Sequence, residues 1–139
     1  MDTRALDAAV NAHFRAEASG DVDAVLGTLT EDVRHHVVGA TFGPLVGRAA
    51  VRPFYEQVIA DTKPSGVTPL HRWYGDGFVV DEMEWAGWLA DGRLFGAPGR
   101  SGRVTFRMLH VFEVRDGLIS VETVYADHAA IAAQLGGQS

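Results

Sequence analysis

The chain has 139 residues, a formal net charge of −6 at pH 7 and no cysteine. This length suits one domain with a sizeable core, and we expect a single domain over residues 1–139. The negative charge and the scattered basic residues argue against binding to nucleic acid, which needs clustered Lys and Arg. The lack of cysteine excludes disulfides, thiolate metal sites and a thiol nucleophile.

The sequence contains no candidate membrane segment. No apolar run approaches the ~20 residues that a transmembrane helix needs. The first residues, MDTRALDAAV, lack the apolar core of a signal peptide. We therefore predict a cytoplasmic protein without a membrane partner.

Two helices are predicted at the start of the chain. Apolar residues recur at helical spacing over residues 4–19, and Gly20 is a good residue to end that helix. Asp21 is a suitable N-cap for a second helix over residues 22–29.

A strand, a loop and a third helix follow. Residues 33–38 alternate as a short strand, and the Gly-rich loop 39–47 lacks the Lys and Ser/Thr of a phosphate-binding loop. The apolar pattern predicts a helix over 48–60, where Pro53 indicates a bend or a late helix start. Residues 61–66 read as a turn region.

The next part of the chain is predicted to be β-structure. Residues 67–74 form a strand, and Pro69 within it indicates a sheet edge or the start of the strand. A Gly-Asp-Gly turn leads to a second strand over 78–89, and a loop-rich segment covers 90–102.

A long hairpin over residues 102–125 gives the strongest signal in the sequence. Its Asp-Gly turn lies between apolar, β-branched arms. Asp127 is then a good N-cap for a terminal helix over 128–136. The order of elements predicts an α+β fold in which a cone-shaped, curved antiparallel sheet wraps around N-terminal helices and leaves a conical cavity.

Two ionisable residues, His110 and Glu122, interrupt the more apolar faces of the two hairpin arms. Side chains alternate along a strand, so both are expected on the same face, with 110 roughly opposite 122–123. Opposed Cβ atoms lie ~4.5–5.5 Å apart, and a carboxylate there would raise the imidazole pKa and orient its tautomer. The pair could serve as general acid and base on an enolisable carbonyl. The alternative is a buried pair that only satisfies its own hydrogen bonds.

Four segments carry a resemblance to a known family: AEASGDVDAVLGTLTEDV, GRAAVRPFYEQV, HVFEVRDGLISVETVYAD and AAIAAQLG. In this order they resemble the SnoaL-like branch of the nuclear transport factor 2-like superfamily. That superfamily includes polyketide cyclases, ketosteroid isomerases, epoxide hydrolases and non-catalytic binding proteins. The resemblance implies the fold, while the reaction depends on the residues of the pocket.

The resemblance also implies roles for single positions. A cyclase histidine matches His110, but the acid/base aspartate of cyclases falls at Val124. The tyrosine of ketosteroid isomerases falls near His13, and their proton-abstracting aspartate falls at Val37. Limonene epoxide hydrolases need one Arg and two Asp at places that are apolar here, so epoxide hydrolysis is not expected.

The predicted pocket is apolar with a few polar anchors, as is usual for sites that bind small molecules. The catalytic candidates are His110, Glu122 and His35. One of the adjacent His35 and His36 should face inward. No cofactor or metal is expected, because no short ligand pair such as His-x-His is present. The residues expected to contact substrate are His13, Phe14, Val37, Phe54, Trp73, Met83, Trp85, Met108, Phe112 and Val124.

The outer face of the hairpin is too apolar for a sheet surface left in water, which predicts a homodimer. Its residues are Leu109, Val111, Val121, Thr123 and Tyr125. The leading functional hypothesis is a cofactor-independent isomerase, cyclase or dehydratase that acts on an apolar carbonyl compound. The alternatives are a non-catalytic protein that binds a hydrophobic small molecule and a purely structural dimerisation module.

Overall fold

The computed structural model of the chain describes residues 2–136. Its helices are α1 (Thr3–Ser19), α2 (Val22–Leu26), α3 (Arg48–Asp61), the short 3₁₀ turn η1 (Arg93–Phe95) and α4 (His128–Gly136). Its strands are β1 (Leu29–Val38), β2 (Leu45–Val46), β3 (Thr62–Tyr74), β4 (Phe78–Leu89), β5 (Gly102–Arg115) and β6 (Leu118–Ala126).

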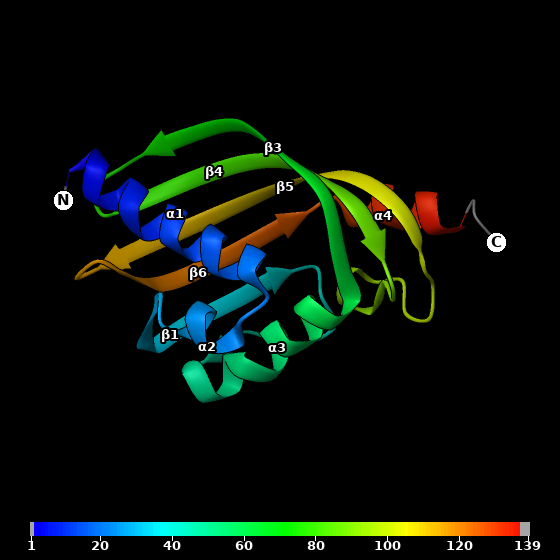
Figure 1. Cartoon of the computed structure of the whole chain (residues 1–139), viewed down its shortest axis with the longest axis horizontal. Helices are drawn as coiled ribbons and strands as arrows, with labels where there is room; N and C mark the ends of the chain where they lie inside the picture. The colour runs from blue at the N-terminus through cyan, green and yellow to red at the C-terminus, as the bar shows by residue number, and fades with distance from the viewer. Residues whose placement is uncertain (1, 137–139) are drawn as a thin grey trace.

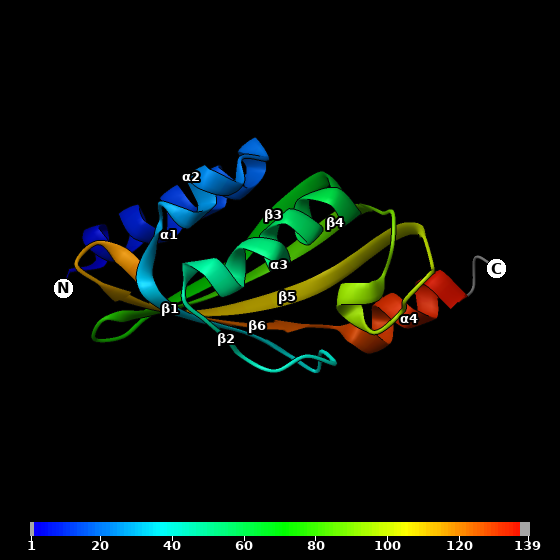
Figure 2. The same cartoon turned by 90° about the horizontal axis from the view of Figure 1, so that it is seen from below.

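The strands form one curved sheet in the order β2-β1-β6-β5-β4-β3. Helices α1, α2 and α3 cover one face of this sheet, and α4 lies at the end of the sheet near the C-terminus (Figures 1 and 2). The predicted α+β fold class is therefore confirmed. Within the described residues, no helix has the length and apolar character needed to cross a bilayer.

The helix caps follow the sequence signals. The Asp21 side chain accepts hydrogen bonds from the backbone N–H groups of Asp23 and Ala24, and Gly20 adopts a left-handed φ of 73°. The second helix ends earlier than predicted, at Leu26, and β1 begins earlier, at Leu29. The early start of β1 follows from pairing, because Leu29 already lies beside β6.

The predicted start of α3 is confirmed, and the predicted turn that follows it is wrong. The helix begins at Arg48 with Pro53 inside it, which excludes the late start, one of the two alternatives for Pro53. Residues 61–66 do not form a turn, because β3 begins at Thr62 and pairs with β4 from there. Pro69 lies within β3, which is an edge strand of the sheet, so the edge prediction is confirmed. Edge strands tolerate proline, which has no backbone N–H to donate.

The β5–β6 hairpin has the predicted turn but a shifted register. Asp116 and Gly117 have φ values of 53° and 78°, as a two-residue Asp-Gly turn requires. A β-bulge close to the turn moves the pairing by one residue, so His110 lies opposite Val124. The predicted direct opposition of 110 and 122–123 is wrong, although His110 and Glu122 do share a face and are diagonal neighbours.

Strand β1 pairs parallel to β6, which makes the sheet mixed rather than wholly antiparallel. This pairing places His35 directly beside Glu122 and Val37 beside Val124. The short strand β2 lies in the loop predicted to be irregular and pairs with β1. Helix packing on this inner face buries a core between α1, α3 and the sheet.

Candidate functional site

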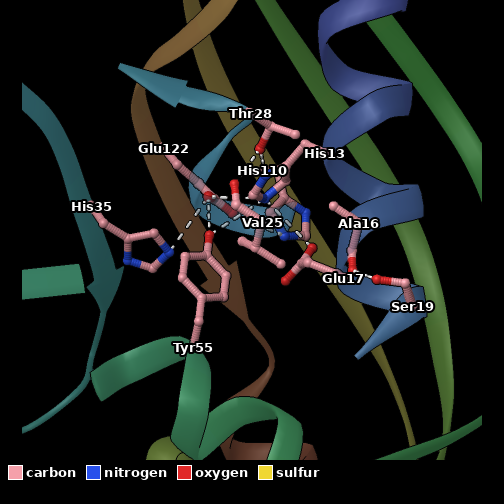
Figure 3. Close-up of polar contacts among 10 residues, drawn as sticks. All are labelled: His13, Ala16, Glu17, Ser19, Val25, Thr28, His35, Tyr55, His110 and Glu122. Carbon is pink, nitrogen blue, oxygen red and sulfur yellow. Dashed lines mark hydrogen bonds and ion pairs between the residues drawn. The ribbon is translucent and has the colours of Figure 1, made fainter. Parts of the chain in front are cut away.

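A buried carboxylate, Glu122 on β6, is the centre of a polar cluster in the concave face of the sheet. It is 1% exposed. Four side chains from four other elements converge on it (Figure 3): His13 from α1, His35 from β1, Tyr55 from α3 and His110 from β5. The sequence analysis paired His110 with Glu122 and expected His35 and His13 in the same pocket, and the structure brings the four side chains together.

Tyr55 makes the shortest contact with the carboxylate. Its hydroxyl donates a hydrogen bond of 2.5 Å to Glu122 Oε1. The side chain is 1% exposed. Burial and the neighbouring carboxylates raise the pKa of Tyr55 well above its usual value, so the hydroxyl keeps its proton.

His13 carries a proton on both ring nitrogens. Thr28 has one hydroxyl proton, which it donates to the carbonyl of Val25, so Thr28 Oγ1 accepts from His13 Nδ1–H at 2.8 Å. The other nitrogen, Nε2, lies 3.2 Å from Glu122 Oε1 and 3.5 Å from Glu17 Oε2. Burial alone would lower the pKa of His13, but these two carboxylates raise it to about 9.

Glu122 is correspondingly held as an anion. Burial opposes its charge, but His13, His35 and the hydrogen bond from His13 lower its pKa well below the usual range. An anion with so low a proton affinity is a poor base at neutral pH. Its geometry suits it to orient its neighbours.

His35 and His110 are neutral imidazoles. Burial lowers the pKa of both, to about 4 for His110, and Glu122 only partly opposes this. Each turns Nε2 toward the carboxylate, at 3.5 Å for His35 and 3.8 Å for His110. Each Nδ1 is buried and has no hydrogen-bond partner among residues 2–136. At 3.8 Å, the separation of His110 from Glu122 is longer than a direct hydrogen bond.

The cluster opens on a cavity of about 560 Å³ between the helices and the sheet. Aromatic and aliphatic side chains make up most of its wall, with Glu122, His35, His110 and Tyr55 among the polar groups. Most of the predicted contact residues line it: Phe14, Val37, Phe54, Met83, Trp85, Met108 and Val124.

A second polar group on the cavity wall joins α1 to β3 and β4. Arg72 donates from Nε to Asp81 Oδ2 at 2.7 Å and from Nη1 to Asp7 Oδ1 at 2.9 Å. Asp81 is 5% exposed and pairs across the sheet with His110. The Arg72 cation is neutralised by two carboxylates, so this group closes the cavity wall as a salt-bridge network.

Three predicted contact residues do not line the cavity. His13 and Phe112 are fully buried behind its wall, where the Phe112 ring stacks on His110 at 5.2 Å. Trp73 is 50% exposed on the outer face. A β-bulge between Pro69 and His71 reverses the faces of β3, so Arg72 faces inward in place of Trp73.

Sequence reasoning missed Tyr55 and Glu17 as site residues. It treated Tyr55 as part of an apolar helix face, although a hydroxyl on a buried face requires a hydrogen-bond partner. Glu17 follows the apolar residues of α1 at helical spacing, so its carboxylate is on the side of the helix that faces the core. A carboxylate in that position needs a charged or hydrogen-bonding partner in the interior of the protein. Of the adjacent histidines, His35 is the inward one and His36 is half-buried on the other face.

No group of three His, Cys, Asp or Glu side chains in the described part of the chain is arranged to hold a metal ion. The converging histidines instead point their Nε2 atoms at one carboxylate. The cluster is thus held together by hydrogen bonds and charge.

Comparisons with known proteins agree with this architecture. The family model described as the SnoaL-like domain matches residues 10–122. A candidate isomerase from Bacillus subtilis superposes with a TM-score of 0.80 at 17% identity, covering 99% of this chain and 97% of that one. A candidate polyketide cyclase from Silicibacter gives 0.79 at 21% identity, covering 96% and 97%.

An LEH-like epoxide hydrolase from M. tuberculosis also superposes, with a TM-score of 0.71 at 24% identity, covering 97% of this chain and 91% of that one. At this level of identity, the likeness to solved structures establishes a shared fold. The search of curated proteins gave no match.

Proposed function

The chain belongs to the SnoaL-like domain family, and on that premise we propose that it is a cofactor-independent enzyme that transfers a proton on an apolar, carbonyl-bearing small molecule. The observation that carries this proposal is a neutral histidine, His110, that lines an apolar cavity beside the Glu122 carboxylate. Isomerisation, cyclisation and dehydration all begin with the removal of such a proton.

His110 is the proposed base. Its Nε2 faces the Glu122 carboxylate, and a nitrogen facing an anion is better protonated than left as a lone pair. A proton taken up by the neutral ring creates an imidazolium beside Glu122, whose negative charge stabilises it.

Glu122 and His35 are proposed as positioning residues. Glu122 fixes the tautomer of His110, while Tyr55 and His13 hold the carboxylate in place. His35 presents the same arrangement from β1, with Nε2 toward Glu122 and Nδ1 unpartnered.

Proton removal can be measured without the natural substrate. We expect the protein to accelerate exchange of the α-protons of 2-tetralone in D₂O, followed by ¹H NMR. His110→Gln is expected to lower the exchange rate by ~10²–10⁴-fold, because an amide has no basic nitrogen.

The matched control for this test is His36→Gln. This histidine follows His35 on β1 and faces away from the cavity. It should exchange 2-tetralone at the wild-type rate. Equal rates for wild type and His110→Gln, with both proteins folded by circular dichroism, would refute the assignment of His110 as the base.

A specific observation favours a second candidate, a non-catalytic binding protein. Val37 and Val124 line the cavity at the two places where the family resemblance implies aspartates, so the wall is apolar there. This candidate predicts stoichiometric binding of 2-tetralone without exchange of its protons.

We also propose that the protein forms a homodimer through the outer face of the sheet. Leu109, Val111 and Val121 are half-buried there, and Tyr125 is 47% exposed. Val111→Lys is expected to convert a dimer to a monomer in sedimentation velocity, because a charge would be buried at the interface. Ala50→Lys, an equal change on the exposed surface of α3, should leave the mass unchanged; a Val111→Lys dimer would exclude this interface.

A further inference from the structure

We propose that Glu17, at the last turn of α1, is the acid that complements His110: it gives a proton to the carbonyl oxygen of the substrate as His110 removes one from carbon. This inference rests on the proposed function. It adds a residue that neither the sequence pattern nor the family resemblance singled out.

The position of Glu17 supports this role. It lines the cavity together with the end of α1, and its side chain is 29% exposed, far more than the other members of the cluster. Its Oε2 lies 3.5 Å from His13 Nε2, which ties it to the buried charges. Phe14, one turn earlier on the helix, packs edge-on against His110 at 5.4 Å between ring centroids. A molecule lying against Phe14 would therefore meet His110 and Glu17 together.

The charges around Glu17 leave it able to hold a proton. The groups that face it are His13 on its own helix, Glu122 on β6 and the Tyr55 hydroxyl on α3, and His35 and His110 lie on the same cavity wall. Burial raises its pKa, the His13 cation lowers it, and Glu122 raises it again, to about 7. Two groups whose proton affinities are driven apart in one site are the pattern of an acid and a base.

The reaction balances on these two residues. The His110 imidazole takes the proton from the α-carbon, the C–H electron pair forms a carbon–carbon double bond, and the carbonyl π pair moves to oxygen. That oxygen takes the proton of Glu17, which gives a neutral enol. The imidazolium then returns its proton to another carbon while the Glu17 carboxylate takes back the hydroxyl proton, so both residues regain their starting states.

The test is the pH dependence of 2-tetralone exchange. Wild type should lose exchange as pH rises through about 7, because Glu17 must be protonated. It should gain exchange as pH rises through about 4, because His110 must be neutral. Glu17→Gln should lose the alkaline limb, keep the acidic limb and exchange ~10²-fold more slowly at pH 5.5.

Two further variants separate this role from a structural one. Glu17→Asp keeps the carboxyl on a shorter arm and should keep an alkaline limb at a reduced rate. Glu56→Gln, an exposed glutamate on α3, should match wild type. If Glu17→Gln retains the wild-type rate and profile while His110→Gln is inactive, Glu17 is not the acid and the proposed function stands. If wild type shows no exchange, both proposals fail.

Discussion

Glu122→Ala is expected to lower the free energy of unfolding by about 3–5 kcal/mol and to abolish exchange of 2-tetralone. The carboxylate is 1% exposed and is the nearest anion to the His13 cation, at 3.2 Å. Removing it leaves a buried charge with only Glu17 to balance it, and Tyr55 loses the acceptor of its hydrogen bond. His110 loses the anion that fixes its tautomer.

Urea unfolding at pH 6.5 measures this effect. Glu122→Gln should destabilise less than Glu122→Ala, because its amide oxygen can still accept from Tyr55. Glu113→Ala, which changes an exposed glutamate on the same hairpin, serves as the control. A loss below about 1 kcal/mol for Glu122→Ala would mean that the cluster contributes no more than a surface ion pair.

The free energy of unfolding of the wild type is expected to fall by about 3 kcal/mol between pH 6.5 and 9.5. His13 has its pKa raised to about 9 in the folded protein, while the unfolded chain binds its proton with an ordinary pKa near 6.5. Between these two pKa values, folded His13 keeps a proton that the unfolded chain has lost. The stabilisation is therefore complete below the unfolded pKa of His13 and is lost as pH rises through the folded pKa.

The same urea experiment, repeated across this pH range, tests the assignment. His13→Gln should be less stable at pH 6.5 and should show a shallower profile above it, in which the remaining loss comes from the ionisation of Glu17. His71→Gln, which replaces an exposed histidine on β3, should keep the wild-type slope. A slope as steep as that of the wild type in His13→Gln would assign the alkaline loss to another group.

Sequence signals that act over a few residues predicted their structures well. The Asp116-Gly117 turn, the Asp21 cap and the shared face of His110 and Glu122 all depend on neighbours in the chain. Each follows from backbone preferences or from the alternation of side chains along a strand. These signals were sufficient to identify the centre of the polar cluster.

Features set by distant partners could not be predicted in the same way. The bulge in β3 exchanges Trp73 for Arg72 on the inner face, and nothing in the local alternation marks it. The parallel pairing of β1 with β6 decides that His35 lies beside Glu122. The hydroxyl of Tyr55 finds its acceptor 67 residues away, so its role depends on how α3 docks.

The side chains of the cluster come from five separate elements, so the cluster can form only late in the synthesis of the chain. His13, His35 and Tyr55 are made first, and none of them has the Glu122 carboxylate as a partner until residue 122 emerges from the ribosome. A nascent chain shorter than this therefore carries no oriented histidine, and any activity of the cavity begins only once nearly the whole sheet has been translated.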